Sequence, residues 1–171
     1  MGGIDRRSVL KAGAWSVPIV VSAVGVPMLA ASPPPGVIQI DFFDARSFPG
    51  VIQTQLAVRN GGSFDAAPIG PNWTATFSYP TSVLAAGDQT PTITDTTGGW
   101  IYSGSTVIGS DRVFTFTRIT NPPVKPSDPS TGLAFNLVSA TTVVLPFTVT
   151  ATVSADAAAT VGTSKTVTAL G

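Results

Sequence analysis

The sequence predicts an all-β protein, an antiparallel β-sandwich, from three observations. Apolar and polar residues alternate with a period of two along most of the chain after Ala31. Clusters of Gly, Pro, Asn, Asp and Ser separate these stretches, and no segment keeps the apolar spacing of a helix. The loops are irregular in length, which favours the Greek-key connections of a sandwich over the alternative, an up-and-down barrel.

The expected strands follow from this alternation. The clearest lie at residues 37–43, 52–58, 73–79, 114–117, 133–137 and 145–153, with shorter ones at 92–94 and 99–103 and a threonine-rich edge strand at 160–170. In the first strand, Ile38, Ile40 and Phe42 are expected to face the core. Threonines and serines on the opposite faces are expected to point to water, so two sheets should pack their apolar faces together.

The chain begins with an expected export signal. Two arginines precede an uncharged apolar stretch, residues 12–31, and a secretory signal has this order of basic and apolar parts. The stretch resembles the twin-arginine class, whose pattern is Ser/Thr-Arg-Arg-x-Phe-Leu-Lys. Arg6, Arg7, Leu10 and Lys11 match this pattern, whereas Asp5 and Val9 depart from it. The resemblance implies the twin-arginine translocase as a partner during export, and the general secretory route is the alternative.

Cleavage after Ala31 is the expected fate of this signal. Pro18 and Pro27 interrupt the apolar stretch, and proline disrupts a helix, so no permanent membrane span is expected. The expected domains are a signal peptide at 1–31, a proline-rich spacer at 32–36 and one β-sandwich domain at 37–171. An uncut signal would be helical and would make the spacer a short stalk above a membrane.

The residue types that are missing exclude much chemistry. The chain of 171 residues contains no cysteine, histidine or glutamate. Catalytic triads with histidine, thiol nucleophiles and His- or Cys-ligated metals are therefore excluded, and no cofactor is expected. Without residues 1–31 the chain keeps six basic residues and eight aspartates. Because the basic residues are scattered, nucleic acid is not an expected partner.

A family resemblance covers roughly residues 51–155. It rests on a strand that ends in Asn60-Gly61-Gly62, the pair Tyr79-Pro80, the pair Gly99-Trp100, a Phe-Thr strand at 113–117 and a Leu-x-Phe-x-Val strand at 145–149. In this order the motifs resemble the immunoglobulin-like repeat domains of bacterial surface proteins. The resemblance implies an immunoglobulin-like sandwich of about seven to nine strands. Only one copy is present, and neither a sorting motif nor a lipid-acceptor cysteine is found, so the mode of any attachment to the envelope is left open.

Several residues could bind a ligand or a metal ion. Asp41 and Asp44 could flank a Ca²⁺ ion, although the dense aspartate spacing of a calcium loop is missing and solvent-facing aspartates are favoured. Trp73 and Trp100 could stack on sugars if exposed, but their strand positions favour the core. The proline-stiffened segment 119–132 is a candidate recognition loop, with a plain surface connection as the alternative.

The sequence therefore predicts a secreted or envelope-associated, non-enzymatic module with a structural or adhesive role. Its partner would be a protein or an envelope glycan. The alternatives are an aspartate-dependent hydrolase, which needs two converging carboxylates, and a Ca²⁺-dependent adhesion module. Whether the domain self-associates through its last strand is left open.

Overall fold

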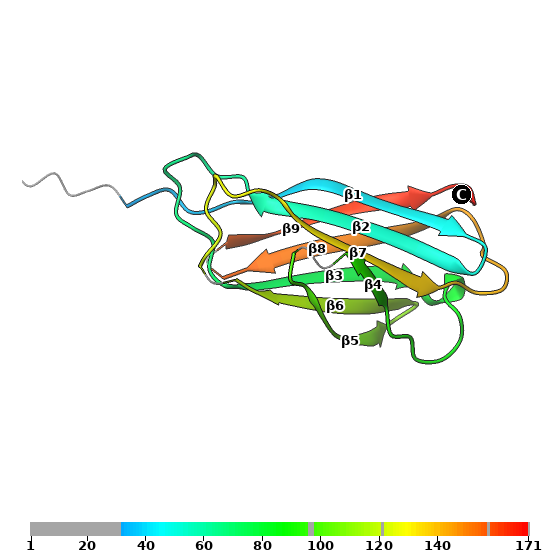
Figure 1. Ribbon diagram of the computed structural model, residues 1–171. Helices are drawn as coiled ribbons and strands as arrows, with labels where there is room; N and C mark the ends of the chain where they lie inside the picture. Colours follow the sequence, from blue (N-terminus) through cyan, green and yellow to red (C-terminus); the bar gives the residue numbers. More distant parts are fainter. Residues whose placement is uncertain (1–31, 96–97, 121, 157, 171) are drawn as a thin grey trace, which may run out of the picture. The chain divides into compact units, whose positions relative to one another are not determined.

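The computed structural model describes residues 32–95, 98–120, 122–156 and 158–170, and those from Pro33 onward belong to one compact unit. Nine strands and one short 3₁₀ helix, Thr81–Val83, form in the described residues. The strands are β1 (Ile38–Phe48), β2 (Val51–Asn60), β3 (Asn72–Pro80), β4 (Thr92–Asp95), β5 (Ile101–Ile108), β6 (Asp111–Ile119), β7 (Thr131–Val138), β8 (Phe147–Ala155) and β9 (Ala158–Val167). Figure 1 shows them in order along the chain.

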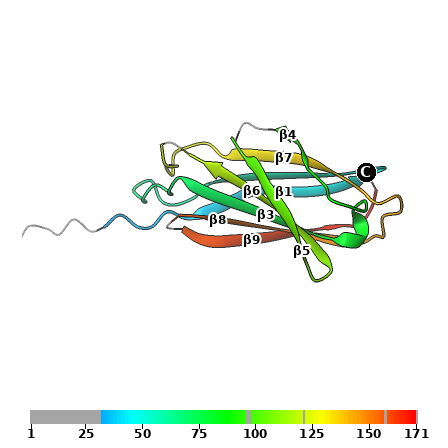
Figure 2. The same ribbon diagram turned by 90° about the horizontal axis from the view of Figure 1, so that it is seen from below.

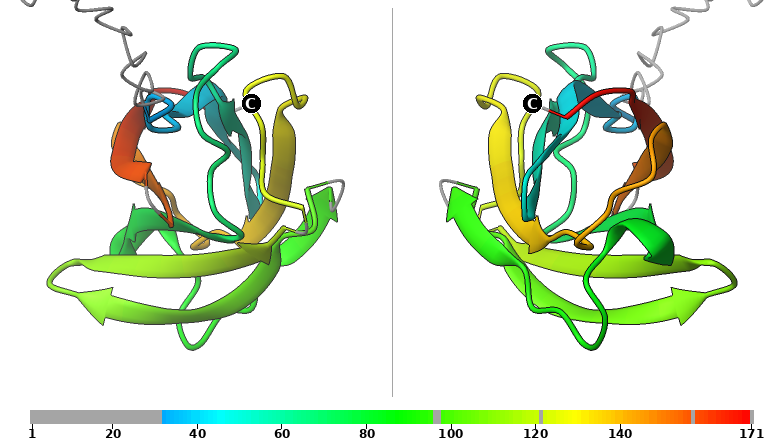
Figure 3. Two further views of the ribbon diagram at one scale, coloured as in Figure 1. Left: turned by 90° about the vertical axis from the view of Figure 1, so that its left-hand side faces the viewer. Right: turned by 90° about the vertical axis from the view of Figure 1, so that its right-hand side faces the viewer.

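The strands form two antiparallel sheets packed face to face. One sheet has the order β1-β2-β7-β4 and the other the order β5-β6-β3-β8-β9. Strands β2 and β7, and likewise β3 and β8, pair although they are distant in the sequence, so long connections cross between the sheets as in a Greek key. The view along the strands in Figure 3 shows the two layers. The predicted fold class, an immunoglobulin-like antiparallel β-sandwich, is confirmed.

Aromatic side chains fill the space between the sheets. The ring of Phe77 on β3 lies 4.9 Å, centroid to centroid, from Phe135 on β7, and Phe116 on β6 lies 4.7 Å from Phe135. All three side chains are fully buried. The period-two alternation predicted these inward positions because successive strand residues point to opposite faces.

One inward polar pair also follows from the alternation. Thr54 on β2 and Tyr79 on β3 are buried, and their hydroxyl oxygens lie 2.6 Å apart in a hydrogen bond between the two sheets. Burial raises the pKa of the Tyr79 phenol well above its ordinary value, and the bond to Thr54 offsets only part of this. The phenol therefore stays neutral and serves as a hydrogen-bonding group in the core.

The prediction that Phe42 faces the core is wrong. A β-bulge at Asp41 interrupts the pairing of β1 with β2, so that Ile40 lies opposite Val58 and Phe42 lies opposite Ala57. The extra residue shifts the alternation by one. Phe43 therefore packs against the core, and Phe42 is 47 % exposed.

Strand β5 is longer than predicted. The alternation predicted residues 99–103, whereas β5 runs from Ile101 to Ile108. A register shift between Tyr102 and Gly104 breaks the period of two, which hid the second half of the strand. Figure 2 shows β5 in the foreground, with the turn that joins it to β6 projecting away from the other strands.

Candidate ligand pocket at one end of the sandwich

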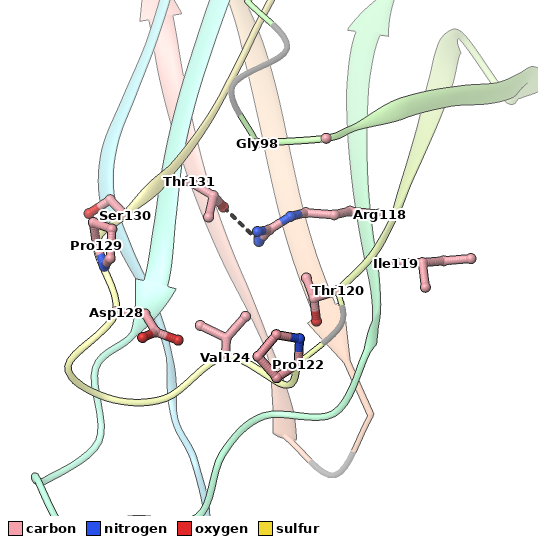
Figure 4. Close-up of a pocket in the computed structure, with 11 residues that line it drawn as sticks. Gly98, Arg118, Ile119, Thr120, Pro122, Val124, Asp128, Pro129, Ser130 and Thr131 are labelled. Carbon is pink, nitrogen blue, oxygen red and sulfur yellow. Dashed lines mark hydrogen bonds between the residues drawn. The ribbon is translucent and has the colours of Figure 1, made fainter.

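An open pocket of about 650 Å³ lies at the end of the sandwich where β6 ends and β7 begins. Three parts of the chain line it: Gly98 and Gly99 before β5, the end of β6, and the loop that leads to Thr131. Figure 4 shows their side chains around the pocket. The proline-rich segment 119–132, predicted as a candidate recognition loop, thus forms most of the wall.

Arg118 contributes a positive charge to this pocket. Phe114, Phe116 and Arg118 alternate along β6 on the inward face, and Arg118 lies opposite the buried Trp73 of β3. The arginine stem therefore lies beside the core and its guanidinium extends into the pocket, where Nη1 donates a hydrogen bond of 3.1 Å to Oγ1 of Thr131 (Figure 4). Partial burial lowers the pKa of Arg118 from its ordinary value, and the group stays charged.

The guanidinium of Arg118 lacks a carboxylate partner among the described residues. Arg46, Arg59, Arg112 and Lys165 each form an ion pair with an aspartate, whereas Arg118 forms none. Asp128 also lines the pocket, but its Oδ2 accepts the backbone N–H of Lys125 at 2.7 Å within a turn. Because a guanidinium carries five N–H donors, Arg118 keeps donors for a ligand.

Asn60 holds the pocket loop in place. Its buried side chain donates from Nδ2 to the carbonyl oxygens of Val124, at 3.1 Å, and Ala67, at 3.2 Å. Its Oδ1 accepts the backbone N–H groups of Gly62 and Val37. Val124 also exchanges two backbone hydrogen bonds with Ile69, so the loop is fixed to the segment after β2.

The two aspartates considered for Ca²⁺ are occupied by cationic side chains. Asp41 forms an ion pair with Arg59 at 3.0 Å, and Asp44 contacts Arg46 at 2.7 Å and Lys165 at 3.1 Å. Partial burial by itself raises the pKa of Asp44, but the hydrogen bonds and charges of Arg46 and Lys165 outweigh it and hold that pKa below its ordinary value. The described residues contain no cluster of three acidic or histidine side chains suited to a metal ion.

Three further aspartates, which a hydrolase could use, have polar partners. Asp88 pairs with Arg112, Asp111 accepts a hydrogen bond from Ser78 at 2.8 Å, and Asp156 accepts one from Asn72 at 2.6 Å. These residues belong to different loops and strand ends.

Both tryptophans considered as sugar platforms belong to the core. Trp73 is 1 % exposed and Trp100 is 2 % exposed, so neither can stack on a sugar ring. The export residues Arg6, Arg7, Leu10 and Lys11 and the cleavage residue Ala31 lie outside the described residues. None of the described residues forms a helix with the length and apolar character that crossing a membrane requires.

Sequence reasoning identified the loop but missed Arg118 and Asn60. Arg118 had a recognisable signal, because it is a charged residue at an inward position of the Phe114-x-Phe116-x-Arg118 alternation, where apolar residues are usual. Asn60 was predicted only as a turn residue, since its buried hydrogen bonds depend on segments distant in the sequence.

No protein-family model and no curated protein matches the chain. Among solved structures, it is similar to a cohesin module of a family 33 glycoside hydrolase from Clostridium perfringens, with 14% identity over 79% of this chain and 96% of that one, and a TM-score of 0.49. A collagen-binding domain of a Staphylococcus aureus adhesin has 11% identity over 75% of this chain and 96% of that one, with a TM-score of 0.42. The major pilin SpaA of Corynebacterium diphtheriae has 11% identity over 70% of this chain and 31% of the pilin, with a TM-score of 0.41. At these identities and TM-scores the likenesses do not extend to function.

Proposed function

We propose that this protein is an exported, non-enzymatic binding module that holds a carboxylate group of its partner in the pocket of Arg118. The observation that carries the proposal is a partly buried guanidinium that faces an open pocket and forms no ion pair within the described residues. The partner is a protein with an acidic side chain or a glycan with an acidic sugar.

The chemistry of the pocket suits a carboxylate. A guanidinium binds a carboxylate through two parallel hydrogen bonds, and partial shielding from water strengthens their charge interaction. Thr120 and Ser130 add hydroxyl groups to the pocket wall; they donate to the carbonyl oxygen of Pro71 and to Asp41, so their oxygen atoms can accept hydrogen bonds from hydroxyl groups of the ligand. The volume lies within the range of small-ligand sites, so the pocket fits one side chain or one sugar ring of a larger partner.

The loop is already fixed before any ligand binds. Asn60 and Ile69 hold Val124, and prolines at 122, 126 and 129 restrict the backbone on either side. A preorganised loop loses less conformational entropy when it binds, which favours affinity. The proposal therefore describes a stiff pocket that accepts a partner without large rearrangement.

The Arg118→Gln substitution is expected to weaken carboxylate binding about tenfold or more, because charge-assisted hydrogen bonds to the guanidinium are lost. Binding is measured by NMR titration of the purified protein with two probes, sodium glucuronate and the blocked peptide Gly-Asp-Gly. Glucose and the blocked peptide Gly-Asn-Gly serve as neutral counterparts. The probe that binds with the higher affinity indicates whether the partner carries an acidic sugar or an acidic side chain.

Arg46→Gln is the matched control, because Arg46 is an exposed arginine outside the pocket. This variant is expected to bind the probes as the unaltered protein does. The proposal fails if neither carboxylate probe shifts the amide signals of the pocket residues, or if both arginine variants bind equally well.

We also propose that residues 1–31 direct export by the twin-arginine route and are then removed. The support is the match of Arg6, Arg7, Leu10 and Lys11 to the twin-arginine pattern and the small residues that end at Ala31. The protein would then act outside the cytoplasm or at the cell envelope. Fractionation of the host followed by N-terminal sequencing is expected to find an exported chain that starts at Ser32. An intact N-terminus in the cytoplasmic fraction would refute this part.

A further inference from the structure

Strand β5 is an exposed sheet edge with an irregularity at Ser103 but without charged residues or proline. It is the outermost strand of the five-stranded sheet, and its eight residues include no charged residue and no proline. Ile101 is 68 % exposed, Val107 52 % and Ile108 64 %. Figure 3 shows the β5–β6 hairpin extending past the remaining strands. An edge of this kind offers its unpaired backbone groups to another strand.

The other sheet edges in the described residues are protected. Strand β4 has only four residues and ends in Asp95. Strands β1 and β9 lie beside each other, and the ion pair of Asp44 with Lys165 joins them. The last strand, whose self-association the sequence left open, is therefore covered along this side, and β5 is the edge that offers a long uncharged surface.

The sequence of β5 is complementary to itself. The register shift of β5 against β6 leaves Ser103 unpaired, so the paired part of the strand is centred on Ser105. When two copies run antiparallel about Ser105, Ile101 of one copy faces Ile108 of the other, Tyr102 faces Val107, and Gly104 faces Thr106. The two outer pairs are favourable cross-strand combinations, aliphatic with aliphatic and aromatic with β-branched.

The paired residues also lie on matching faces of the sheet, as this register requires. Ile101 and Ile108 lie opposite Thr117 and Asp111 of β6, which are on the outer face. Tyr102 and Val107 lie opposite Phe116 and Arg112, which are on the inner face. Members of each pair therefore point to the same side, as cross-strand partners must. Gly104, near the centre, has open space where a side chain would be, so a second backbone can approach closely.

We propose that β5 pairs with β5 of a second copy, which joins two five-stranded sheets into one across a two-fold axis. The buried area sets the strength of this dimer. A stable interface needs about 800 Å² from each partner, or about 20 residues, and an edge of eight residues supplies less. The dimer is therefore weak and reversible, and its population rises with protein concentration.

A charge-swap experiment on the full chain tests both the dimer and its register, with sedimentation velocity over a concentration series as the measurement. The unaltered chain is expected to pass from monomer to dimer. Ile101→Lys/Ile108→Lys is expected to raise the dissociation constant about tenfold or more, because like charges then face each other. Ile101→Lys/Ile108→Glu is expected to restore the dimer, because opposite charges meet across the two-fold axis.

Positions 101 and 108 are about 20 Å apart along one strand, because Ser103 is an extra residue in the register, so the restored pair can form only between copies. Val144→Lys, at an exposed apolar residue outside the strands, is the control and leaves the dimer unchanged. Circular dichroism checks that each variant is folded. A chain that stays monomeric up to about 1 mM overturns the proposal, as does a dimer that survives the double-lysine change or is not restored by the lysine–glutamate pair. These outcomes leave the role of Arg118 untouched, since β5 does not line its pocket.

Discussion

Replacing Phe77 by alanine is expected to lower the free energy of unfolding by about 3–5 kcal/mol. Phe77 is fully buried at the centre of β3, which pairs with β6 on one side and β8 on the other. Its ring packs edge-on against Phe116, 5.6 Å away, and against Phe135 of the opposite sheet. The truncation therefore leaves a cavity where the two sheets meet, and the strands on both sides of Phe77 restrict how far the cavity can close.

Urea unfolding followed by tryptophan fluorescence measures this loss, since Trp73 and Trp100 are buried in the same core. Phe64→Ala is the matched control, because Phe64 is 90 % exposed and its removal is expected to change stability by less than about 0.5 kcal/mol. Equal effects of the two substitutions would contradict the aromatic packing described for the core.

Replacing Asn60 by leucine is expected to lower the free energy of unfolding by about 2–4 kcal/mol and also to weaken carboxylate binding. The substitution keeps the number and branching of the side-chain heavy atoms but removes the hydrogen bonds to Val124, Ala67, Gly62 and Val37. Each buried polar group left without a partner costs about 1–3 kcal/mol, and Val124 keeps its second bond from Ile69. The pocket loop then loses an anchor, although Asn60 does not line the pocket.

Two measurements separate these effects. Urea unfolding gives the stability, and hydrogen exchange of the Val124 amide reports on the loop, with faster exchange expected in the variant. Gln55→Leu removes an exposed amide from the same strand and is expected to change neither quantity. A variant that is destabilised but binds glucuronate or Gly-Asp-Gly as before would show that Asn60 supports the fold and not the pocket.

Local patterns explain which strands the sequence could predict. Trp73, Ala75, Phe77 and Tyr79 alternate without interruption, and all four are buried. The predictions fail where a strand has an irregularity. The bulge at Asp41 reversed the expected direction of Phe42, and the shift beside Gly104 hid half of β5. A bulge depends on the partner strand as well as on its own residues, so alternation within one strand does not reveal it.

The sequence by itself determined the two-layered β architecture, because strands that alternate apolar and polar residues each have one apolar face to bury against another sheet. It also excluded histidine and cysteine chemistry, because those residues are absent. The tertiary structure decided which residues from distant parts of the sequence come into contact. Asn60 binds the carbonyl oxygen of Val124, 64 positions away, and Arg118 at the end of β6 donates to Thr131 at the start of β7. The pocket therefore depends on contacts between distant segments, which a local pattern of residues does not encode.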